Sequence, residues 1–268
     1  MATPVLFVHG LWLHATSWQR WVDLFRRAGY EPEAPGWPGE PDTVEAARLA
    51  PEQIADRGIE EITTHFAELA LKLGKTAQGI PPVIIGHSFG GLIVQKLMAR
   101  GLGSAGIAID PAPMKGVLVI PPSSLKASFP ALKNPANKRK AVSLTAAQFR
   151  YAFGNAVSEE ESNALHERWA IPSPAKPLFQ AAFANVTPHS EAAVDTKNSH
   201  RGPLLITAGG KDHTVPAGVS RATHKRYKHS TATTELLEFP DRGHSLTIDS
   251  GWQEVADGCL AWLKANGL

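Results

Sequence analysis

The chain has 268 residues, of which 43% are hydrophobic and 19% are charged, and its formal net charge at pH 7 is +2. These values exclude an intrinsically disordered chain and disfavour a dedicated nucleic-acid-binding protein. No stretch approaches the run of about 18 apolar residues that a membrane span needs, and no signal-peptide pattern opens the chain. The single cysteine, Cys259, cannot form an intrachain disulfide. We therefore expect a cytoplasmic protein with no nucleic-acid partner and no membrane partner.

Short apolar runs alternate with helical patterns along the chain, which is typical of a parallel sheet covered on both faces. The expected strands are Val5–Val8, Tyr30–Ala34, Pro82–Ile85, Gly106–Asp110, Pro203–Ala208 and Glu235–Phe239. The expected helices include one that follows Thr16, one from Ile59 to a stop at Gly74, one from Phe89 to Arg100 and one from Trp252 to Leu263. The sequence therefore predicts an α/β protein with a mostly parallel sheet of about six strands flanked by helices.

The alternation of strands and helices breaks between Met114 and Gly202. This stretch is rich in proline and contains short helical pieces at Thr145–Phe153 and Glu159–Trp169. Because it lies between two expected core strands, we interpret it as an insertion rather than a linker. The predicted organisation is a core made of residues 1–113 and 203–268, with residues 114–202 as a mainly helical cap.

The segment Gly86-His87-Ser88-Phe89-Gly90 has the pattern of a nucleophile elbow. In this motif a serine occupies a sharp turn from a strand into a helix. The residues two before and two after it must be small, because a larger side chain would collide across the turn. An apolar strand runs directly into this segment and a helix runs out of it, as the motif requires. Ser88 is therefore the candidate nucleophile.

A nucleophilic serine needs a base, and histidine is the usual base at neutral pH. His244 follows the last expected strand and is the predicted base; His87 is a competitor, but its place beside Ser88 in a strained turn favours a packing role. An acid must then hold the base in the correct tautomer. Asp212, after the strand Pro203–Ala208, is the favoured acid, and Asp110 is the alternative.

Acyl-transfer chemistry also needs N–H groups that stabilise a developing oxyanion. The amide of Phe89 comes directly after Ser88 at a helix N-terminus, and the amide of Leu11 follows the first strand; both are predicted donors. Leu11, Ser88, Asp212 and His244 each come shortly after the carboxyl end of an expected parallel strand. Such ends share one edge of the sheet, so we expect these four residues to converge there.

With these motifs the sequence resembles the α/β-hydrolase family. The resemblance is carried by the His9-Gly10 loop, the elbow from Gly86 to Gly91, the segment from Asp212 to Pro216, and Gly243-His244, in the order Ser…Asp…His. It implies the α/β-hydrolase fold and the serine-nucleophile, esterase-like branch with an inserted cap. Serine at the elbow, where dehalogenases and epoxide hydrolases of the family carry aspartate, favours acyl transfer.

The expected function is hydrolysis of small or medium apolar carboxylic esters through an acyl-enzyme intermediate. Amide or lactone hydrolysis, perhydrolysis and a lyase reaction with the same triad remain alternatives, and a non-catalytic ligand-binding protein is a further one. No cofactor is expected, because the sequence has no zinc-type ligand cluster, phosphate-binding loop or dinucleotide fingerprint; Asp212-His213 alone is too weak a signal for a metal.

The substrate pocket is expected to involve Trp12 and His14, which lie in the oxyanion loop, and the cap aromatics Phe149, Phe153 and Trp169. The alternative is that these aromatic residues form the core of the cap itself. The sequence leaves the oligomeric state open, although an exposed apolar cap would favour a homodimer.

Overall fold

A six-stranded parallel sheet forms the centre of the protein, whose computed structural model describes residues 2–268. Its strands are β1 (Pro4–Val8), β2 (Glu31–Glu33), β3 (Val83–His87), β4 (Ala105–Ile109), β7 (Leu204–Gly209) and β8 (Thr234–Phe239). They lie in the order β2-β1-β3-β4-β7-β8, and every neighbouring pair is parallel. The predicted strands are therefore confirmed, with ends that differ by one or two residues, and the sheet is the one expected for the α/β-hydrolase fold.

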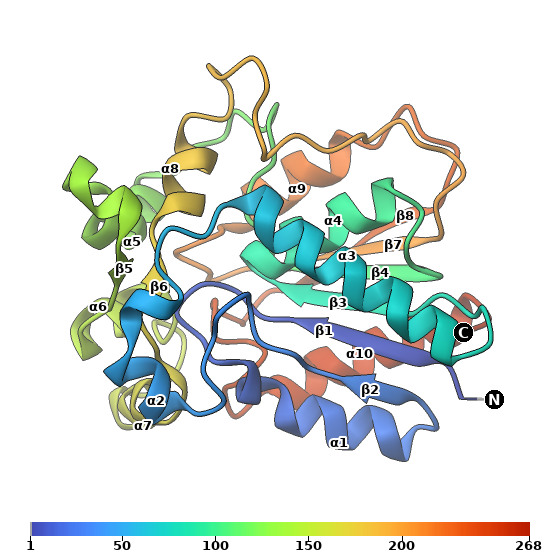
Figure 1. Cartoon of the computed structure of the whole chain (residues 1–268), viewed down its shortest axis with the longest axis horizontal. Helices are drawn as coiled ribbons and strands as arrows, with labels where there is room; N and C mark the ends of the chain where they lie inside the picture. Colours follow the sequence, from blue (N-terminus) through green and yellow to red (C-terminus); the bar gives the residue numbers. More distant parts are fainter. Residues whose placement is uncertain (1) are drawn as a thin grey trace.

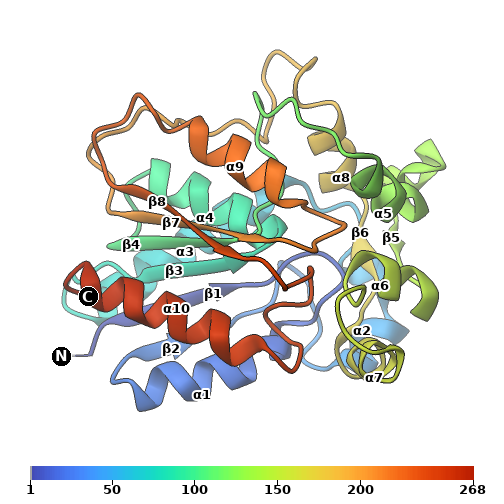
Figure 2. The same ribbon diagram turned by 180° about the vertical axis from the view of Figure 1, so that it is seen from behind.

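Helices cover both faces of the sheet (Figures 1 and 2). One face packs against α1 (Gln19–Arg27) and α10 (Trp252–Ala265), and the other against α3 (Ile59–Thr76), α4 (Phe89–Ala99) and α9 (Ala217–Lys225). Side chains of a strand alternate between these two apolar clusters: Val5 and Phe7 join the first, and Leu6 and Val8 join the second. All four are fully buried, as expected for a parallel sheet.

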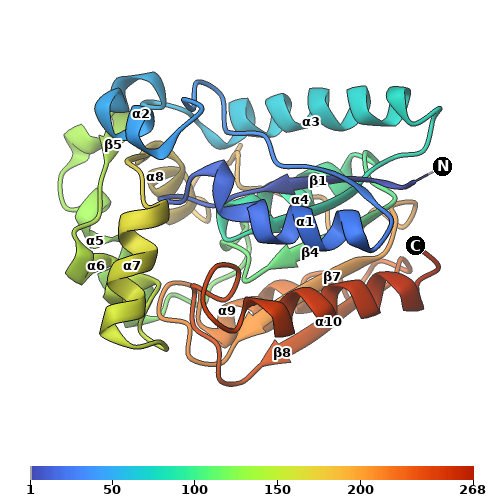
Figure 3. The same cartoon turned by 90° about the horizontal axis from the view of Figure 1, so that it is seen from below.

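The stretch expected as a cap lies across the carboxyl ends of the strands (Figures 1 and 3). Its elements are α5 (Pro122–Leu132), η3 (Pro135–Arg139), β5 (Ala141–Val142), α6 (Ala146–Ala152), α7 (Glu159–Trp169), β6 (Ser173–Pro174) and α8 (Lys176–Ala182). Strands β5 and β6 pair antiparallel as a small separate ribbon. The two helical pieces expected around Thr145–Phe153 and Glu159–Trp169 correspond to α6 and α7.

The short helix α2 (Val44–Leu49), outside the expected cap range, also packs on the cap. Arg48 donates hydrogen bonds to the carbonyl oxygens of Ala170 and His166, at the end of α7. The remaining elements are the short 3-10 helices η1 (Ala15–Trp18) and η2 (Pro51–Gln53). Among the residues that the structure describes, no helix is both long and apolar enough to cross a membrane.

The sequence predicts that helix α3 stops at Gly74, but the helix continues to Thr76. Its reversal is made by Gly79, whose φ of 93° lies in the left-handed region that glycine adopts most readily. Helix α9 was not predicted; it directly follows the loop that carries Asp212.

Candidate active site

Ser88 occupies a strained turn between β3 and α4. Its φ of 57° and ψ of −118° are unusual for a non-glycine residue. A Cβ atom on Gly86 would collide with the carbonyl oxygen of Gly90, and one on Gly90 would collide with that of Val8. Both glycines are thus required by close backbone approach. The geometry is that of a nucleophile elbow, with Ser88 at its apex.

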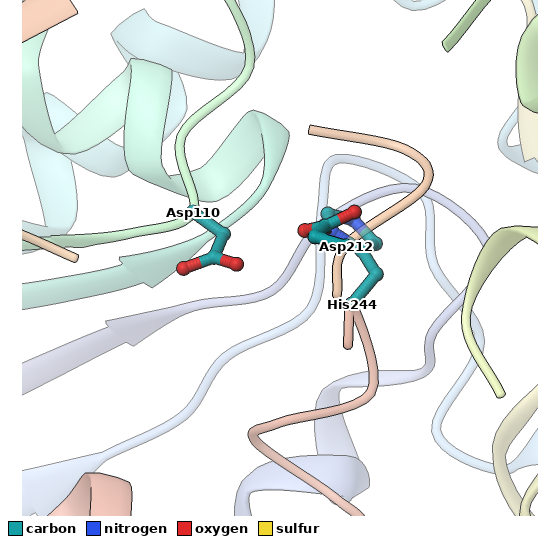
Figure 4. A group of neighbouring side chains, drawn as sticks. All are labelled: Asp110, Asp212 and His244. Carbon is teal, nitrogen blue, oxygen red and sulfur yellow. The ribbon is translucent and has the colours of Figure 1, made fainter. Parts of the chain in front are cut away.

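Asp212 and His244 form a buried pair at the carboxyl edge of the sheet (Figure 4). His244 Nδ1 lies 2.6 Å from Asp212 Oδ2, and both side chains are fully buried. The other oxygen of Asp212, Oδ1, accepts hydrogen bonds from the amides of Thr214 (2.6 Å) and Val215 (2.7 Å). The carboxylate is therefore fixed in orientation. Nε2 of His244 is buried and has no hydrogen-bond partner among residues 2–268, so it is free to accept a proton from a hydroxyl.

Asp110, the alternative acid, makes no hydrogen bond with His244, although its carboxyl lies beside that of Asp212. Its carboxyl accepts from the Thr207 hydroxyl (2.8 Å) and from the amide of Gly209 (2.9 Å). Burial and the negative charge of Asp212 raise the pKa of Asp110 well above its ordinary value. Two neighbouring buried carboxyls are not readily ionised together, so the raised pKa of Asp110 favours its neutral form.

His87 packs beside the predicted base, as expected from the sequence. Its ring centre is 4.6 Å from that of His244, and the ring of Phe153 lies 4.8 Å from His244 on another side. Burial, with a further contribution from His244, holds the pKa of His87 well below its usual value. A neutral His87 adds no positive charge next to an imidazolium that would form on His244.

The predicted oxyanion donors, Leu11 and Phe89, both lie next to Ser88. A Cβ atom on Gly10, the residue before Leu11, would be 2.8 Å from the Cβ of Ser88 and 3.5 Å from its Oγ. The chain that carries Leu11 thus passes directly beside the candidate nucleophile. Phe89 is the first residue of α4, where backbone amides have no partner within the helix. Across residues 2–268, neither amide donates to another protein group.

A buried network of charged and aromatic groups, which the sequence did not indicate, supports this loop. Glu40 Oε2 is 3.0 Å from His9 Nε2, and Glu40 Oε1 accepts from the amide of Ala15. Burial opposes ionisation of Glu40, but His9, His14 and this amide outweigh it and lower its pKa. The ring of His9 also stacks on Trp37. His9 therefore helps to organise the loop, and Glu40 is the residue that fixes it.

The loop is also attached to the cap by backbone and side-chain hydrogen bonds. The amide of Trp12 donates to Ser173 Oγ (2.6 Å), and its indole Nε1 donates to the carbonyl oxygen of Val142 (2.9 Å). The carbonyl oxygen of Trp12 accepts from the amide of Ile171, and the amide of His14 donates to the carbonyl oxygen of Trp169. These bonds join the segment after Leu11 to the β5–β6 ribbon and the end of α7.

A cavity of about 160 Å³ begins at Ser88 and Phe89 and extends toward the surface beneath α5 and α8. Its walls are mainly apolar and include Val117, Val215 and Val219. Its outer part is lined by Val119, Ile120 and Leu125, which are themselves exposed. A ligand in this cavity would reach Ser88 with its reactive end and contact aliphatic side chains with the rest.

The five residues expected around the pocket do not line this cavity. His14 is the N-cap of the short helix η1, and its ring contacts Thr16 Oγ1 and the carbonyl oxygen of Pro41. The others are buried in the cap or where the cap meets the loop: Trp12, Phe149, Phe153 and Trp169. Phe149 and Phe153 stack on each other at 4.8 Å. The cap aromatics thus serve as core, because large flat rings fill the space between α6, α7 and the sheet edge.

Asp110, Asp212 and His244 are the described residues whose potential ligand atoms come within 4.8 Å of one another. Their oxygens and Nδ1, however, already accept or share protein hydrogen bonds, which accounts for the arrangement without an ion. The neighbouring His213 points to the cap, where Nδ1 lies 3.1 Å from the carbonyl oxygen of Tyr151.

Comparison with known proteins places this geometry in a family. The model of the family described as "Alpha/beta hydrolase family" matches residues 5–258. No curated protein sequence matches the chain.

Many solved structures share the fold. A monoacylglycerol lipase from Paleococcus ferrophilus is 20% identical, with a TM-score of 0.63 and coverage of 99% of this chain and 97% of its own. The methylesterase MES16 from Arabidopsis is 15% identical, with a TM-score of 0.62 and coverage of 98% and 99%. A putative non-heme bromoperoxidase, BpoC, from Mycobacterium tuberculosis is 17% identical, with a TM-score of 0.71 and coverage of 99% and 93%. At these identities the similarity concerns the fold.

Proposed function

The chain belongs to the α/β-hydrolase family, and on that basis we propose that it is a serine hydrolase that cleaves carboxylic esters with small or medium apolar groups. The observation that carries the proposal is the position of Ser88. It lies at the apex of a strained elbow and lines an apolar cavity. The loop that positions Asp212 against His244 supplies Thr214 and Val215 to the same cavity.

In the proposed reaction, Ser88 Oγ attacks the ester carbonyl carbon while His244 Nε2 takes the hydroxyl proton. The carbonyl oxygen becomes an oxyanion, which the amides of Leu11 and Phe89 stabilise. When the C–O bond breaks, His244 returns the proton to the leaving alkoxide, and the acyl group stays on Ser88. Water then attacks the acyl-enzyme with His244 again as base, releasing the acid and restoring the Ser88 hydroxyl. Asp212 holds the imidazole and stabilises its protonated form.

The apolar walls of the cavity support an aliphatic group on one side of the ester. The side chains of Val117, Val215 and Val219 carry no charge. The cavity volume of about 160 Å³ is smaller than the several hundred Å³ that are typical of sites for drug-sized ligands. We therefore expect turnover of p-nitrophenyl esters to be highest with short acyl chains and to fall toward dodecanoate.

The test is a chain-length series of p-nitrophenyl esters together with covalent labelling by a fluorophosphonate. Ser88→Ala and His244→Ala should each lower kcat by several orders of magnitude, about 10⁶ in a well-studied serine protease, and the double variant should lose little more. Ser124→Ala is the matched control, because Ser124 is another hydroxyl of the same cavity; it should keep its labelling. Two results would contradict the proposal: fluorophosphonate labelling that survives Ser88→Ala, or losses of kcat from the two single variants that add up in the double variant.

A further inference from the structure

Helix α5 has an inverted distribution of side chains. It buries the small residues Ala127 and Ala131 and exposes the large apolar residues Leu125 and Phe129. Helices on globular proteins normally bury their large apolar residues and expose polar ones. Leu125 and Phe129 are four positions apart, so they lie on the same side of the helix. The exposed side of α5 therefore carries a pair of large apolar side chains rather than a single isolated one.

Two loops extend this apolar surface around the mouth of the cavity. Leu118, Val119 and Ile120 precede α5, and Phe183 and Val186 follow α8. Leu118 and Val186 are 75% and 78% exposed, so most of their apolar surface lies in solvent. We call these five residues, with Leu125 and Phe129, the apolar lip. Most of the large exposed hydrophobic side chains of residues 2–268 belong to it; Leu49 and Leu71 are the exceptions.

The lip is held together by specific hydrogen bonds. Asn185 accepts from the amide of Gly116 (2.7 Å) and donates to the carbonyl oxygen of Val117 (3.0 Å). Lys115 Nζ donates to the carbonyl oxygens of Thr187 and Pro188. The two loops are thus fixed side by side, and Figure 2 shows both at the same end of the molecule as α5 and α8. The surface exists before any partner binds.

Positive charge is concentrated in the stretch of chain that includes α5. Between Pro111 and Ser158 the chain has seven Lys and Arg residues and no Asp or Glu, although the whole chain is only +2. Lys126 and Lys133 flank Phe129 along α5, and Lys138, Arg139 and Lys140 follow at the end of η3. All five are exposed, and within the described chain none of them forms an ion pair. Long basic side chains with apolar stems suit a surface that is apolar within and anionic at its boundary.

We propose that the apolar lip and these basic residues dock the protein on an anionic lipid surface, with the mouth of the cavity toward the lipid. The occupant is inferred from the charge of the segment and from the continuity of the lip with the cavity. An uncharged partner would offer no negative groups to pair with the basic side chains. A second copy of this chain would bring the same positive segment against itself, because a two-fold interface pairs a patch with itself.

This proposal departs from the expectation of no membrane partner, which rested on the net charge of the whole chain. The net charge of the whole chain does not report that basic residues are concentrated in one segment. Docking on a surface also requires no helix that crosses the bilayer. It is independent of ester hydrolysis, so Ser88→Ala should bind lipid like the wild type. Failure of the proposed chemistry and failure of this proposal are therefore distinguishable.

The experiment is co-sedimentation of the full chain with phosphatidylglycerol vesicles and with phosphatidylcholine vesicles. We expect binding to phosphatidylglycerol that weakens when salt is raised from about 0.05 to about 0.5 M, and much weaker binding to phosphatidylcholine. The lip variant Phe129→Ser with Val186→Ser should bind phosphatidylglycerol at least about tenfold more weakly. Neutralising Lys138, Arg139 and Lys140 to Gln should cost about fivefold for each charge.

The matched control is Leu49→Ser with Leu71→Ser, which removes two exposed leucines away from the lip and should leave binding unchanged. Turnover of a short soluble ester should be the same in the lip variant as in the wild type, because neither Phe129 nor Val186 lines the cavity. Three results would overturn the proposal: no binding to phosphatidylglycerol at low salt, equal loss in the control, or a dimer that the lip variant converts to monomer without any lipid binding.

Discussion

The two buried carboxyls at the sheet edge lead to opposite predictions for the same substitution. Asp212 receives three hydrogen bonds, from the amides of Thr214 and Val215 at Oδ1 and from His244 at Oδ2. In Asp212→Asn the amide oxygen must remain with the two backbone donors, because an NH₂ group cannot accept from them. The NH₂ group then faces His244 Nδ1, which has to become the acceptor.

This change of tautomer places the ring proton on His244 Nε2. The Nε2 atom can then no longer accept the hydroxyl proton of Ser88. The wrong tautomer costs about 10⁴-fold in kcat in a well-studied serine protease, equivalent to about 5 kcal/mol of transition-state stabilisation. We expect a loss of this size for Asp212→Asn, with little change in KM because the amide oxygen keeps the hydrogen bonds that hold Thr214 and Val215 in the cavity wall.

Asp110→Asn is the matched comparison. The amide oxygen can accept from Gly209, and the NH₂ group can face the hydroxyl of Thr207, which can rotate to accept. Because the pKa of Asp110 is raised well above its ordinary value, a neutral amide is a close substitute for its carboxyl, and we expect less than about a tenfold loss of kcat. The assay is steady-state hydrolysis of a short p-nitrophenyl ester by both variants. A larger loss for Asp110→Asn than for Asp212→Asn would refute this reasoning and assign the acid to Asp110.

The other predictions concern stability and reactivity. Gly90→Ala should unfold the elbow, since its Cβ would meet the backbone of β1, whereas Gly218→Ala, exposed on α9 with open space around it, should raise stability by about 0.5–1 kcal/mol in urea denaturation. Glu40→Gln should cost about 1–3 kcal/mol at pH 7. Because the pKa of Glu40 is lowered, its contribution is present above about pH 4 and lost below it, so the difference between variant and wild type should shrink at acid pH. Burial raises the pKa of the Cys259 thiol, so a thiol reagent at pH 8 should label it only after denaturant is added; prompt labelling of the native protein would contradict its burial.

The core of the fold could be predicted because its signals are local. Most of the strands are short apolar runs, with β2 the clear exception, and the helices α3 and α10 carry apolar residues at helical spacing, so burial on one face is visible in the sequence. The family motifs locate Ser88, Asp212 and His244, and the structure brings Asp212 and His244 together at 2.6 Å. Asp212 and Asp110 both follow a parallel strand; the sequence favours Asp212, and its 2.6 Å contact with His244 agrees with that preference.

The cap could not be predicted to the same extent. Helix α5 has no ordinary apolar periodicity, because it exposes Leu125 and Phe129 and buries alanines, so pattern analysis overlooks it. Helices α2 and α8 are only 6 and 7 residues long, too short for a clear period. The expected pocket aromatics were placed by residue type, and an aromatic side chain fills a core as readily as it lines a site. The partnership of Glu40 with His9 joins residues far apart in the chain, and no local pattern reports it.

The hydrogen bonds between Trp12 and the cap have a consequence for engineering. Ser173 and Ile171 hold the backbone directly after Leu11, and Val142 holds the indole of Trp12, so the cap is part of the frame that sets the position of a predicted oxyanion donor. A cap transplanted from a relative would have to reproduce these partners, or the graft would shift Leu11 while leaving Ser88, Asp212 and His244 in place. Selection for new substrates is therefore expected to act on α5, α8 and their loops, which can vary without disturbing that frame, and to leave the β5–β6 ribbon unchanged.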